Sequence, residues 1–290
     1  MSTQITTAFV EQYSNNVTML SQQMGSLLRN AVDVETIKGK NAFFEQIGEV
    51  AAQVRTTRHG NTPQIDTPHS RRRVSLADYE WADLIDDQDK VRMLIDPTSS
   101  YAKAAAAAMG RSMDDVIITA LGGTADTGVA GGTSTALPAS QKPFSASQTD
   151  GLTIAKLLEA KFLLDNASVD PSLKRYIVCG PKQIQDLLAT TEVKSSDFNT
   201  VKALAQGEIN SFLGFEFIPS TRLSFDATNT DDRLCYAFTE DAVKLAIGKD
   251  VTARIDERAD KSYSTQVYYC MSIGATRMEE EKVVEIACDE

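Results

Sequence analysis

The sequence is poor in cysteine and has no long apolar run. It has 4 cysteines among 290 residues, and their spacing is wide and irregular. That pattern favours reduced, buried thiols in a reducing compartment over a disulfide framework or a zinc knuckle. No stretch approaches the roughly 18 apolar residues of a membrane span, and the polar N-terminus does not resemble a secretion signal. The cysteines are Cys179, Cys235, Cys270 and Cys288.

Basic residues are the minority among the charges. Lys and Arg number 29 against 40 Asp and Glu, which gives a net charge of −11. This balance argues against a surface built mainly to neutralise nucleic-acid phosphates. With 42% hydrophobic residues, 8 Pro and 16 Gly, the composition is nevertheless that of a globular chain. The length predicts one large or two modest domains.

Motifs for catalysis and metal binding are also missing. His59 and His69 are the only histidines, and both fall in a polar segment where we expect them to be solvated. No G-x-S-x-G or Walker motif occurs, and the Gly-rich stretch 122–132 follows a predicted helix instead of preceding one. Adjacent acidic pairs such as Asp114-Asp115 are expected to be solvated or capping groups. The sequence therefore predicts no enzyme, no metal and no cofactor, with a phosphate- or nucleotide-binding enzyme that uses loop 122–132 as the weakest alternative.

The first third of the chain predicts extended parts with little core of their own. Residues 1–37 have apolar residues at helical spacing, as at Phe9, Tyr13 and Val17, and are interpreted as an arm. Residues 44–57 and 71–81 favour a long two-stranded hairpin around a polar, turn-rich segment. An isolated ribbon is marginally stable in water, so we expect it to lie on another copy of the chain.

Helices and strands follow in a recognisable order. A short amphipathic helix is expected around Leu84 to Ile95, and a long one over residues 97–121, with Asp96 as its N-cap and the Gly-rich loop 122–140 as its end. A second region predicts helices at 153–164 and 181–188 and strands at 175–179 and 214–219. The remaining β-rich segments are expected to form a sheet on the long helix; they are 234–238, 243–247, 251–256, 265–273 and 283–286.

Two charged patches are the candidate functional residues. The basic patch could contact phosphate or an acidic surface on a neighbouring subunit, and the net acidity of the chain favours the neighbour. The acidic patch is first interpreted as a solvated turn between two strands, and the alternative is that it pairs with those arginines. The candidate inter-subunit residues are Arg55, Arg58, Arg71, Arg72, Arg73, Glu279, Glu280 and Glu281.

The order of these parts resembles the major capsid proteins of tailed double-stranded DNA phages that share the Hong Kong 97-type fold. The closest local similarity is DDVIITALGGTADTGVAGGTS at residues 114–134 and LTIAKLLEAKFLLDNASVDPSLKRYIVCGPKQIQDLL at 152–188. GEINSFLGFEFIPSTRL at 207–223 and SIGATRMEEEKVVEI at 272–286 are similar as well. These motifs are structural, and none is a catalytic signature.

The resemblance implies an α+β fold with five parts. Residues 1–37 would be an N-terminal arm and 38–82 an extended β-hairpin loop that reaches over the adjacent subunit. Residues 83–149 would form a peripheral domain with a spine helix at 97–121. An α/β axial domain would occupy 150–240, and residues 241–290 would supply the C-terminal strands of the peripheral sheet.

The same resemblance implies the function and the partners. Many copies would assemble as hexamers and pentamers into an icosahedral shell around the double-stranded DNA genome, located in the virion capsid after synthesis in the bacterial host cytoplasm. Expected partners are other copies, a separate scaffolding protein, a portal protein and, as an open option, a decoration protein. DNA would be packaged without sequence-specific contacts, and no membrane is involved. The alternative from the same fold is the shell protein of a bacterial nanocompartment. The prototype's Lys-to-Asn cross-link has no matching positions here.

Overall fold

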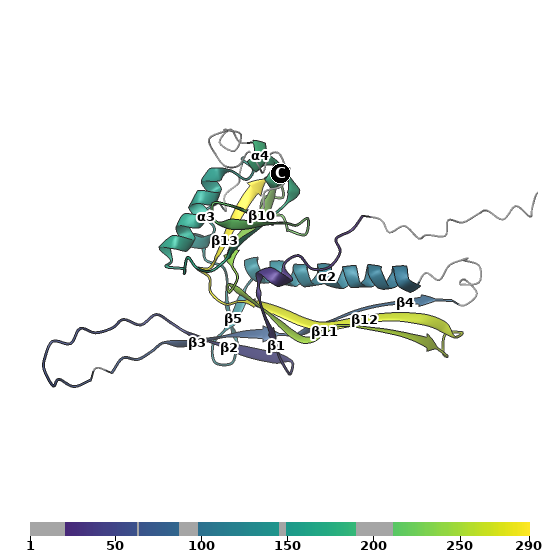
Figure 1. Cartoon of the computed structure of the whole chain (residues 1–290), viewed down its shortest axis with the longest axis horizontal. Helices are drawn as coiled ribbons and strands as arrows, with labels where there is room; N and C mark the ends of the chain where they lie inside the picture. The colour runs from purple at the N-terminus through teal and green to yellow at the C-terminus, as the bar shows by residue number, and fades with distance from the viewer. Residues whose placement is uncertain (1–20, 63, 87–97, 145–148, 190–210) are drawn as a thin grey trace, which may run out of the picture.

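A computed structural model describes residues 21–62, 64–86, 98–144, 149–189 and 211–290. The part of the chain within these ranges is elongated and combines three β-sheets with a few helices (Figure 1). One sheet lies along a long helix, and a second sheet forms a compact block with two helices near one end of that long helix. The third sheet lies at the base of a projecting loop. No helix in the described part of the chain is long and apolar enough to span a membrane.

The long helix α2 (Thr98–Gly122) is the spine of the molecule. Its 25 residues extend over about 37 Å at 1.5 Å per residue. Met109, Met113, Ile117 and Leu121 recur every four residues and are all buried, so they form one apolar face. This face packs mainly against strand β12 (Ser264–Arg277). The predicted spine helix is confirmed, while its expected capping residues at 96 and 97 lie outside the described residues.

The sheet on the spine helix has the order β1-β11-β12-β4. The expected strands 243–247 and 251–256 are one strand, β11 (Val243–Arg258), whose pairing with β12 shifts register between residues 247 and 252. Strand β1 (Asp33–Thr36) pairs parallel with β11. Leu84 lies in strand β4 (Ala77–Ile85) and not in the expected helix, because side chains in β4 alternate between exposed and partly buried as in a strand. The rest of that expected helix, from residue 87 to residue 95, lies outside the described residues.

The third sheet has the order β2-β3-β5-β6 and holds the base of the loop. Strands β2 (Asn41–Ile47) and β3 (His69–Ser75) pair antiparallel, so the ladder is shorter than the expected hairpin of 44–57 with 71–81. Residues 48–68 form the loop between them. The Gly-rich segment, expected as a loop, contains strands β5 (Ala125–Thr127) and β6 (Thr133–Thr135), and β5 pairs with β3.

The compact block contains a five-stranded sheet of order β13-β10-β7-β9-β8. Predicted helices α3 (Ile154–Asn166) and α4 (Pro181–Ala189) and predicted strands β7 (Arg175–Cys179) and β9 (Phe215–Pro219) are confirmed. The remaining strands are β8 (Ser211–Phe212), β10 (Asp232–Thr239) and β13 (Val283–Asp289). Strands β10 and β13 were both expected in the sheet on the spine helix, but they pair with each other in this sheet, and β13 forms its edge.

The four cysteines are free and buried, as predicted. Cys179, Cys235 and Cys288 belong to the interior of the five-stranded sheet. Burial raises the pKa of the Cys179 thiol to about 12, and the pKa of Cys235 is also raised, by its contact with Cys288 and by burial. These thiols therefore serve as apolar packing groups.

The described part of the N-terminal arm is held on the spine helix by Asp114. Asp114 is fully buried and accepts hydrogen bonds from the Ser26 hydroxyl at 2.5 Å and from the backbone N–H groups of Leu27 and Leu28 at 3.1 Å. This corrects the expectation of a solvated or capping carboxylate. The apolar residues at helical spacing in the arm, Phe9, Tyr13 and Val17, lie outside the described residues. A short 3₁₀ turn, η2 (Arg29–Ala31), leads from this anchor into β1.

Candidate functional site

The structure gives the Gly-rich segment a packing role. A Cβ atom on Gly122 would lie 2.2 Å from the Tyr236 hydroxyl, and one on Gly131 would lie 2.6 Å from the Arg73 side chain. Both glycines therefore permit close packing, and β5 pairs on both sides with neighbouring strands. Among the described residues, no group of three His, Cys, Asp or Glu side chains could hold a metal ion. The structure offers no support for a phosphate site in this segment.

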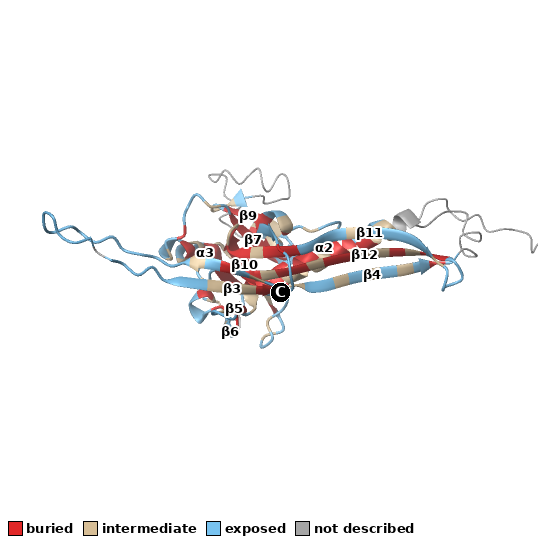
Figure 2. Ribbon diagram, turned by 90° about the horizontal axis from the view of Figure 1, so that it is seen from below, coloured by how far each residue is buried: buried red, intermediate tan, exposed pale blue. Residues whose placement is uncertain are grey.

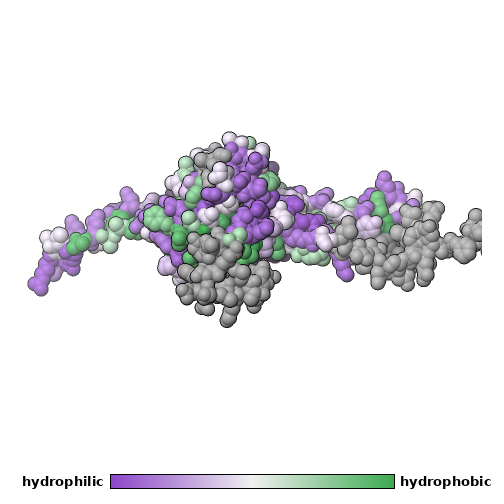
Figure 3. Space-filling view, turned by 90° about the horizontal axis from the view of Figure 1, so that it is seen from above, coloured by the Kyte–Doolittle hydropathy of each residue, from purple (hydrophilic) through white to green (hydrophobic). Residues whose placement is uncertain are grey.

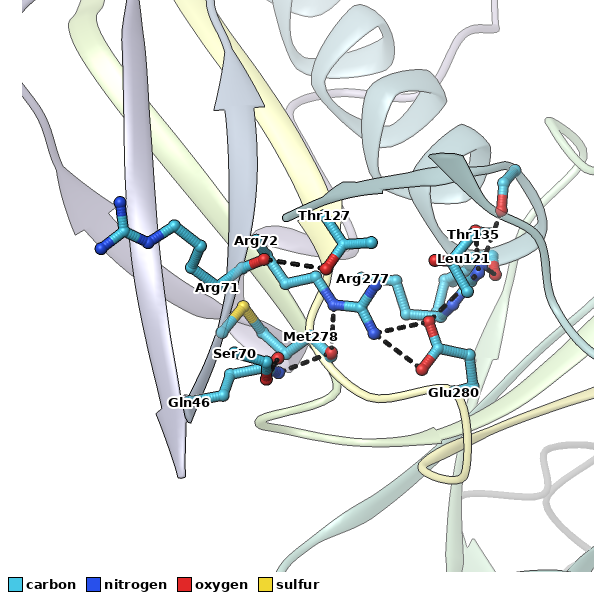
Figure 4. A network of polar contacts seen from close by, with 11 residues as sticks. Gln46, Ser70, Arg71, Arg72, Leu121, Thr127, Thr135, Arg277, Met278 and Glu280 are labelled. Carbon is cyan, nitrogen blue, oxygen red and sulfur yellow. Dashed lines mark hydrogen bonds and ion pairs between the residues drawn. The ribbon is translucent and has the colours of Figure 1, made fainter. Parts of the chain in front are cut away.

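Arg72 joins the loop base to the body of the molecule. In the β2–β3 ladder it faces inward, where it is only 7% exposed. Its Nε donates to the Met278 carbonyl at 2.9 Å, and its Nη2 donates to both carboxylate oxygens of Glu280 at 2.7 Å (Figure 4). Gln46, on β2, donates from Nε2 to the same Met278 carbonyl at 2.6 Å. The turn between β12 and β13 is thereby attached to both strands of the loop base.

Arg277 extends this network to the spine helix. It is fully buried and donates to the carbonyls of Leu121 at 2.9 Å and Gly123 at 2.7 Å, which satisfies the C-terminal end of α2. A third bond reaches the Thr135 carbonyl at 3.2 Å, and the Glu280 carboxylate lies 3.9 Å away. Burial lowers the pKa of Arg277 from its ordinary value, and Glu280 opposes that shift.

Arg71 and Arg73 lie on the opposite face of β3 from Arg72 and also have partners within the chain. Arg71 pairs with Glu45 at 2.6 Å and lies over the Phe43 ring, 5.5 Å from its centroid. Arg73 pairs with Asp126 at 2.6 Å. For these arginines and Arg72, the structure therefore supplies acidic partners in the same chain. Whether they also contact a neighbouring subunit stays a prediction.

The acidic patch, Glu279 to Glu281, was first interpreted as a solvated turn, and the structure confirms this only in part. Glu280 is engaged by Arg72, and Glu279 lies 3.3 Å from Lys282, which also pairs with Asp241 at 2.6 Å. Glu281 is exposed, and it forms no ion pair with the residues that the structure describes. The pairing of this turn with the arginine patch therefore exists within one chain, through Arg72 and Glu280.

The projecting loop carries the two remaining candidate residues. Every described residue between 48 and 68, Arg55 and Arg58 included, is exposed (Figure 2). The ends of the loop meet at the base, where the Gly48 N–H donates to the Pro68 carbonyl at 2.9 Å. Apolar and polar side chains mix along the loop (Figure 3), and Val54 is 87% exposed. Such a segment gains little stability from burial within its own chain.

Sequence reasoning identified the charged patches but missed the residues that organise them. Arg277 follows a β-rich segment without any sign that it would be buried, and Asp114 resembled an ordinary solvated helix carboxylate. For Asp114 one signal was present, an aspartate in the interior of a long helix instead of its first turn. Arg277 is the last residue of β12, and the strand sequence itself gives no comparable signal. Their partners come from distant parts of the chain, which a local pattern does not reveal.

Solved capsid structures share this architecture. The capsid of cyanophage P-SCSP1u matches with a TM-score of 0.74 at 16% identity, covering 99% of this chain and 94% of that chain. The capsid of Ralstonia phage GP4 matches with a TM-score of 0.73 at 11% identity, covering 97% of this chain and 95% of that chain. The cyanophage Pam1 capsid asymmetric unit matches with a TM-score of 0.72 at 14% identity, covering 98% of this chain and 97% of that chain. The expected α+β capsid fold is therefore confirmed.

No curated protein matches the chain in sequence. The model of one protein family does match the sequence, and the match covers almost the whole chain. Because the model of the phage capsid protein family matches residues 5–290, the chain belongs to that family.

Proposed function

We propose that this structural capsid protein assembles as hexamers and pentamers into a closed icosahedral shell around the double-stranded DNA genome of a tailed phage. The observation that carries the proposal is the contrast between a body with its own core and an entirely exposed loop that projects from it (Figures 1 and 2). A projection whose described residues are all exposed supports contact with another copy. Repeated by symmetry, many such contacts hold an assembly together.

Residues at the loop and arm are proposed to supply these contacts. Arg55 and Arg58 are the loop's exposed basic residues, and exposed apolar residues such as Val54 would become buried on docking. The intrachain bonds of Arg72 and Arg277 hold the loop base, so the loop leaves the body in one direction. Further proposed partners are a separate scaffolding protein, a portal protein and, optionally, a decoration protein, with synthesis and assembly in the bacterial host cytoplasm.

Electron microscopy of the full-length protein purified from a bacterial host tests the proposal. We expect closed shells, or rings with fivefold and sixfold symmetry, and nuclease-resistant double-stranded DNA inside particles recovered from phage infection. A protein that stays monomeric at high concentration, with and without co-expressed phage assembly proteins, would contradict the proposal. Particles that enclose an enzyme and no DNA would favour the nanocompartment.

A matched variant tests the role of the loop. Replacing residues 49–67 with Asn-Gly keeps the β2–β3 ladder and the Gly48–Pro68 closure, and it leaves Arg72 in place. We expect a soluble, folded chain, since the removed residues that the structure describes are all exposed, and no shells or rings. Shells of normal size from this variant would show that the loop is dispensable for assembly.

A further inference from the structure

The distal half of strand β11, residues 249–258, is paired on one side only. Strand β1 pairs with residues 244–247, and the β11–β12 ladder then shifts register between residues 247 and 252. Beyond this shift, β12 is the only strand next to β11 in the described part of the chain. On the other side, backbone N–H and C=O groups are left unpaired over roughly 30 Å, which makes this half of β11 a free sheet edge.

The side chains of this edge are exposed on both faces of the sheet. Every residue from 248 to 257 except Thr252 is exposed (Figure 2). Val251, Ala253 and Ile255 lie two residues apart, on the face where β12 contributes to the main core, and Ile255 is 52% exposed. A strand with one apolar face normally buries that face. The three residues therefore form an apolar stripe without a cover in a single copy of the chain.

The first limb of the projecting loop, residues 49–55, has the same pattern and no sheet to join. Val50, Ala52 and Val54 lie two residues apart, and the sequence predicts a strand through residue 57, but the ladder with β3 ends at Ile47. All residues of the limb are exposed, and none forms a backbone–backbone hydrogen bond with another described residue. The limb is therefore a strand-forming segment that lacks a partner strand.

We propose that the loop limb of one copy adds as a strand to the free edge of β11 in a second copy. Strand addition of this kind supplies affinity through main-chain hydrogen bonds and specificity through alternate side chains. Seven extended residues span about 23 Å, which fits within the free edge. The inference rests on the proposed function and specifies the surface that receives the loop.

The two segments belong to different copies because of where they lie in one chain. The loop projects from one end of the molecule, and the turn between β11 and β12 lies at the opposite end (Figure 1). A limb therefore does not reach the free edge of its own chain. The contact joins two different surfaces, and such heterologous contacts generate rings when the rotation closes.

The alternation of side chains restricts how the strands pair. If Val50 and its apolar neighbours continue the apolar stripe, Glu49 and Arg55 lie on the opposite face of the sheet, together with Arg254 and Asp256. Arg254 and Asp256 form no ion pair with the described residues, so each charge of the limb has an opposite charge available on the strand. A slip by one residue would place the charged residues on the apolar face.

Strand β4 is the other free edge of the same sheet, and it is a poorer receiver for the limb. Its apolar residues Tyr79 and Trp81 already pack against the main core of their own chain. Strand addition at β4 would therefore cover few exposed apolar side chains, and β4 serves as the internal comparison in the experiments.

Hydrogen exchange of the full-length chain tests the location of the contact. Peptides that cover residues 49–55 and 249–258 should exchange several-fold more slowly in shells than in dilute subunits, because their free N–H groups become bonded. Protection of residues 77–85 in place of 249–258 would overturn the proposal, and so would a loop that is protected while residues 249–258 are not.

A proline scan of the limb tests whether main-chain hydrogen bonds hold it. In a strand added to an edge, only every second N–H points toward the sheet, and proline removes that donor. Among A51P, A52P, Q53P and V54P, two alternate variants should lose about tenfold or more in subunit association, and the other two should associate nearly normally. All four subunits should melt like wild type, because these positions are exposed. Equal effects at all four positions, mild or severe, would overturn the proposal.

Cross-linking compares the two edges directly. The native cysteines are buried, so a short bismaleimide reagent will react mainly with introduced, exposed thiols. The double variant V54C/A253C should give a ladder of covalent oligomers on a denaturing gel. The matched control V54C/A82C places the second thiol on an exposed alanine of β4 and should give little or none.

The outcomes separate this contact from the proposed function. If shells form but V54C/A253C gives no ladder, or if both double variants give equal ladders, the proposed contact fails and the capsid function stands. If the wild-type chain forms no rings or shells, the proposed function fails and the contact fails with it.

Discussion

The spine helix and the projecting loop divide the molecule into a part that holds itself together and a part that does not. One face of α2 is buried from Met109 to Leu121, whereas every described residue from 48 to 68 is exposed (Figure 2). Hydrophobic burial stabilises the helix within its own chain, and the loop has no such contribution. We therefore expect the stability of the subunit and the proposed capacity to assemble to depend on different residues, and substitutions should separate them.

The largest effect on stability is expected in the spine. Leu121→Ala removes a fully buried side chain at the end of the apolar face of α2 and leaves a cavity. The free energy of unfolding should fall by about 3–5 kcal/mol, as measured by denaturant titration of the unassembled subunit. A change as small as that of an exposed residue would show that the spine face is not the core of the chain.

Substitutions at the loop base should have an intermediate effect on the free energy of unfolding, because the loop base joins the loop to the body. Arg72→Met removes a largely buried, bidentate pair with Glu280, and we expect a loss of about 2 kcal/mol, less than for a fully buried pair because Glu280 is partly exposed. Arg71→Met is the matched control on the same strand. Its pair with Glu45 is solvent-exposed, so its loss should stay below about 1 kcal/mol. Equal losses in the free energy of unfolding for the two variants would contradict the claim that the buried pair stabilises the subunit more than the exposed one.

Alkaline pH should destabilise the body and spare the loop, which holds no buried acid. Cys179 must stay protonated in the folded chain, because burial raises the pKa of its thiol to about 12 from an ordinary value of 9.0. Stability is therefore full below pH 9 and falls as the pH rises from 9 toward 12, because the unfolded chain releases this proton first. Cys179→Ala should lessen the loss by about 1.4 kcal/mol per pH unit in that window. Denaturant titrations at pH 8 and 10 measure the difference, and an unchanged slope would refute it.

The smallest effect on stability is expected at the loop. Val54 is 87% exposed, so Val54→Ser should change the free energy of unfolding of the subunit by less than about 0.5 kcal/mol. Its effect on assembly should be larger than its effect on unfolding, because the side chain becomes buried only between copies. A variant that melts several degrees lower would place Val54 in contact with the body and would remove the distinction between loop and spine.

Local patterns were sufficient for the elements whose structure depends on nearby residues. The spine helix was predictable from its Ala-rich, proline-free run, and α3, β7, α4 and β9 from periodicity and turn residues. The order of the parts also indicated the capsid family, which the family model confirms over residues 5–290. The polar, turn-rich character of the segment between the predicted hairpin strands, residues 58–70, followed from its composition alone.

Only the tertiary structure decided where distant segments meet. It placed β13 in the five-stranded sheet, turned the Gly-rich segment into strands on β3 and gave Arg72 an acidic partner 208 residues away in the chain. It also buried Arg277 and Asp114, whose surroundings no local pattern describes. The physical reason is that helix propensity, turn chemistry and charge act over a few residues, whereas pairing register and the burial of a charge depend on contacts between segments far apart in the sequence.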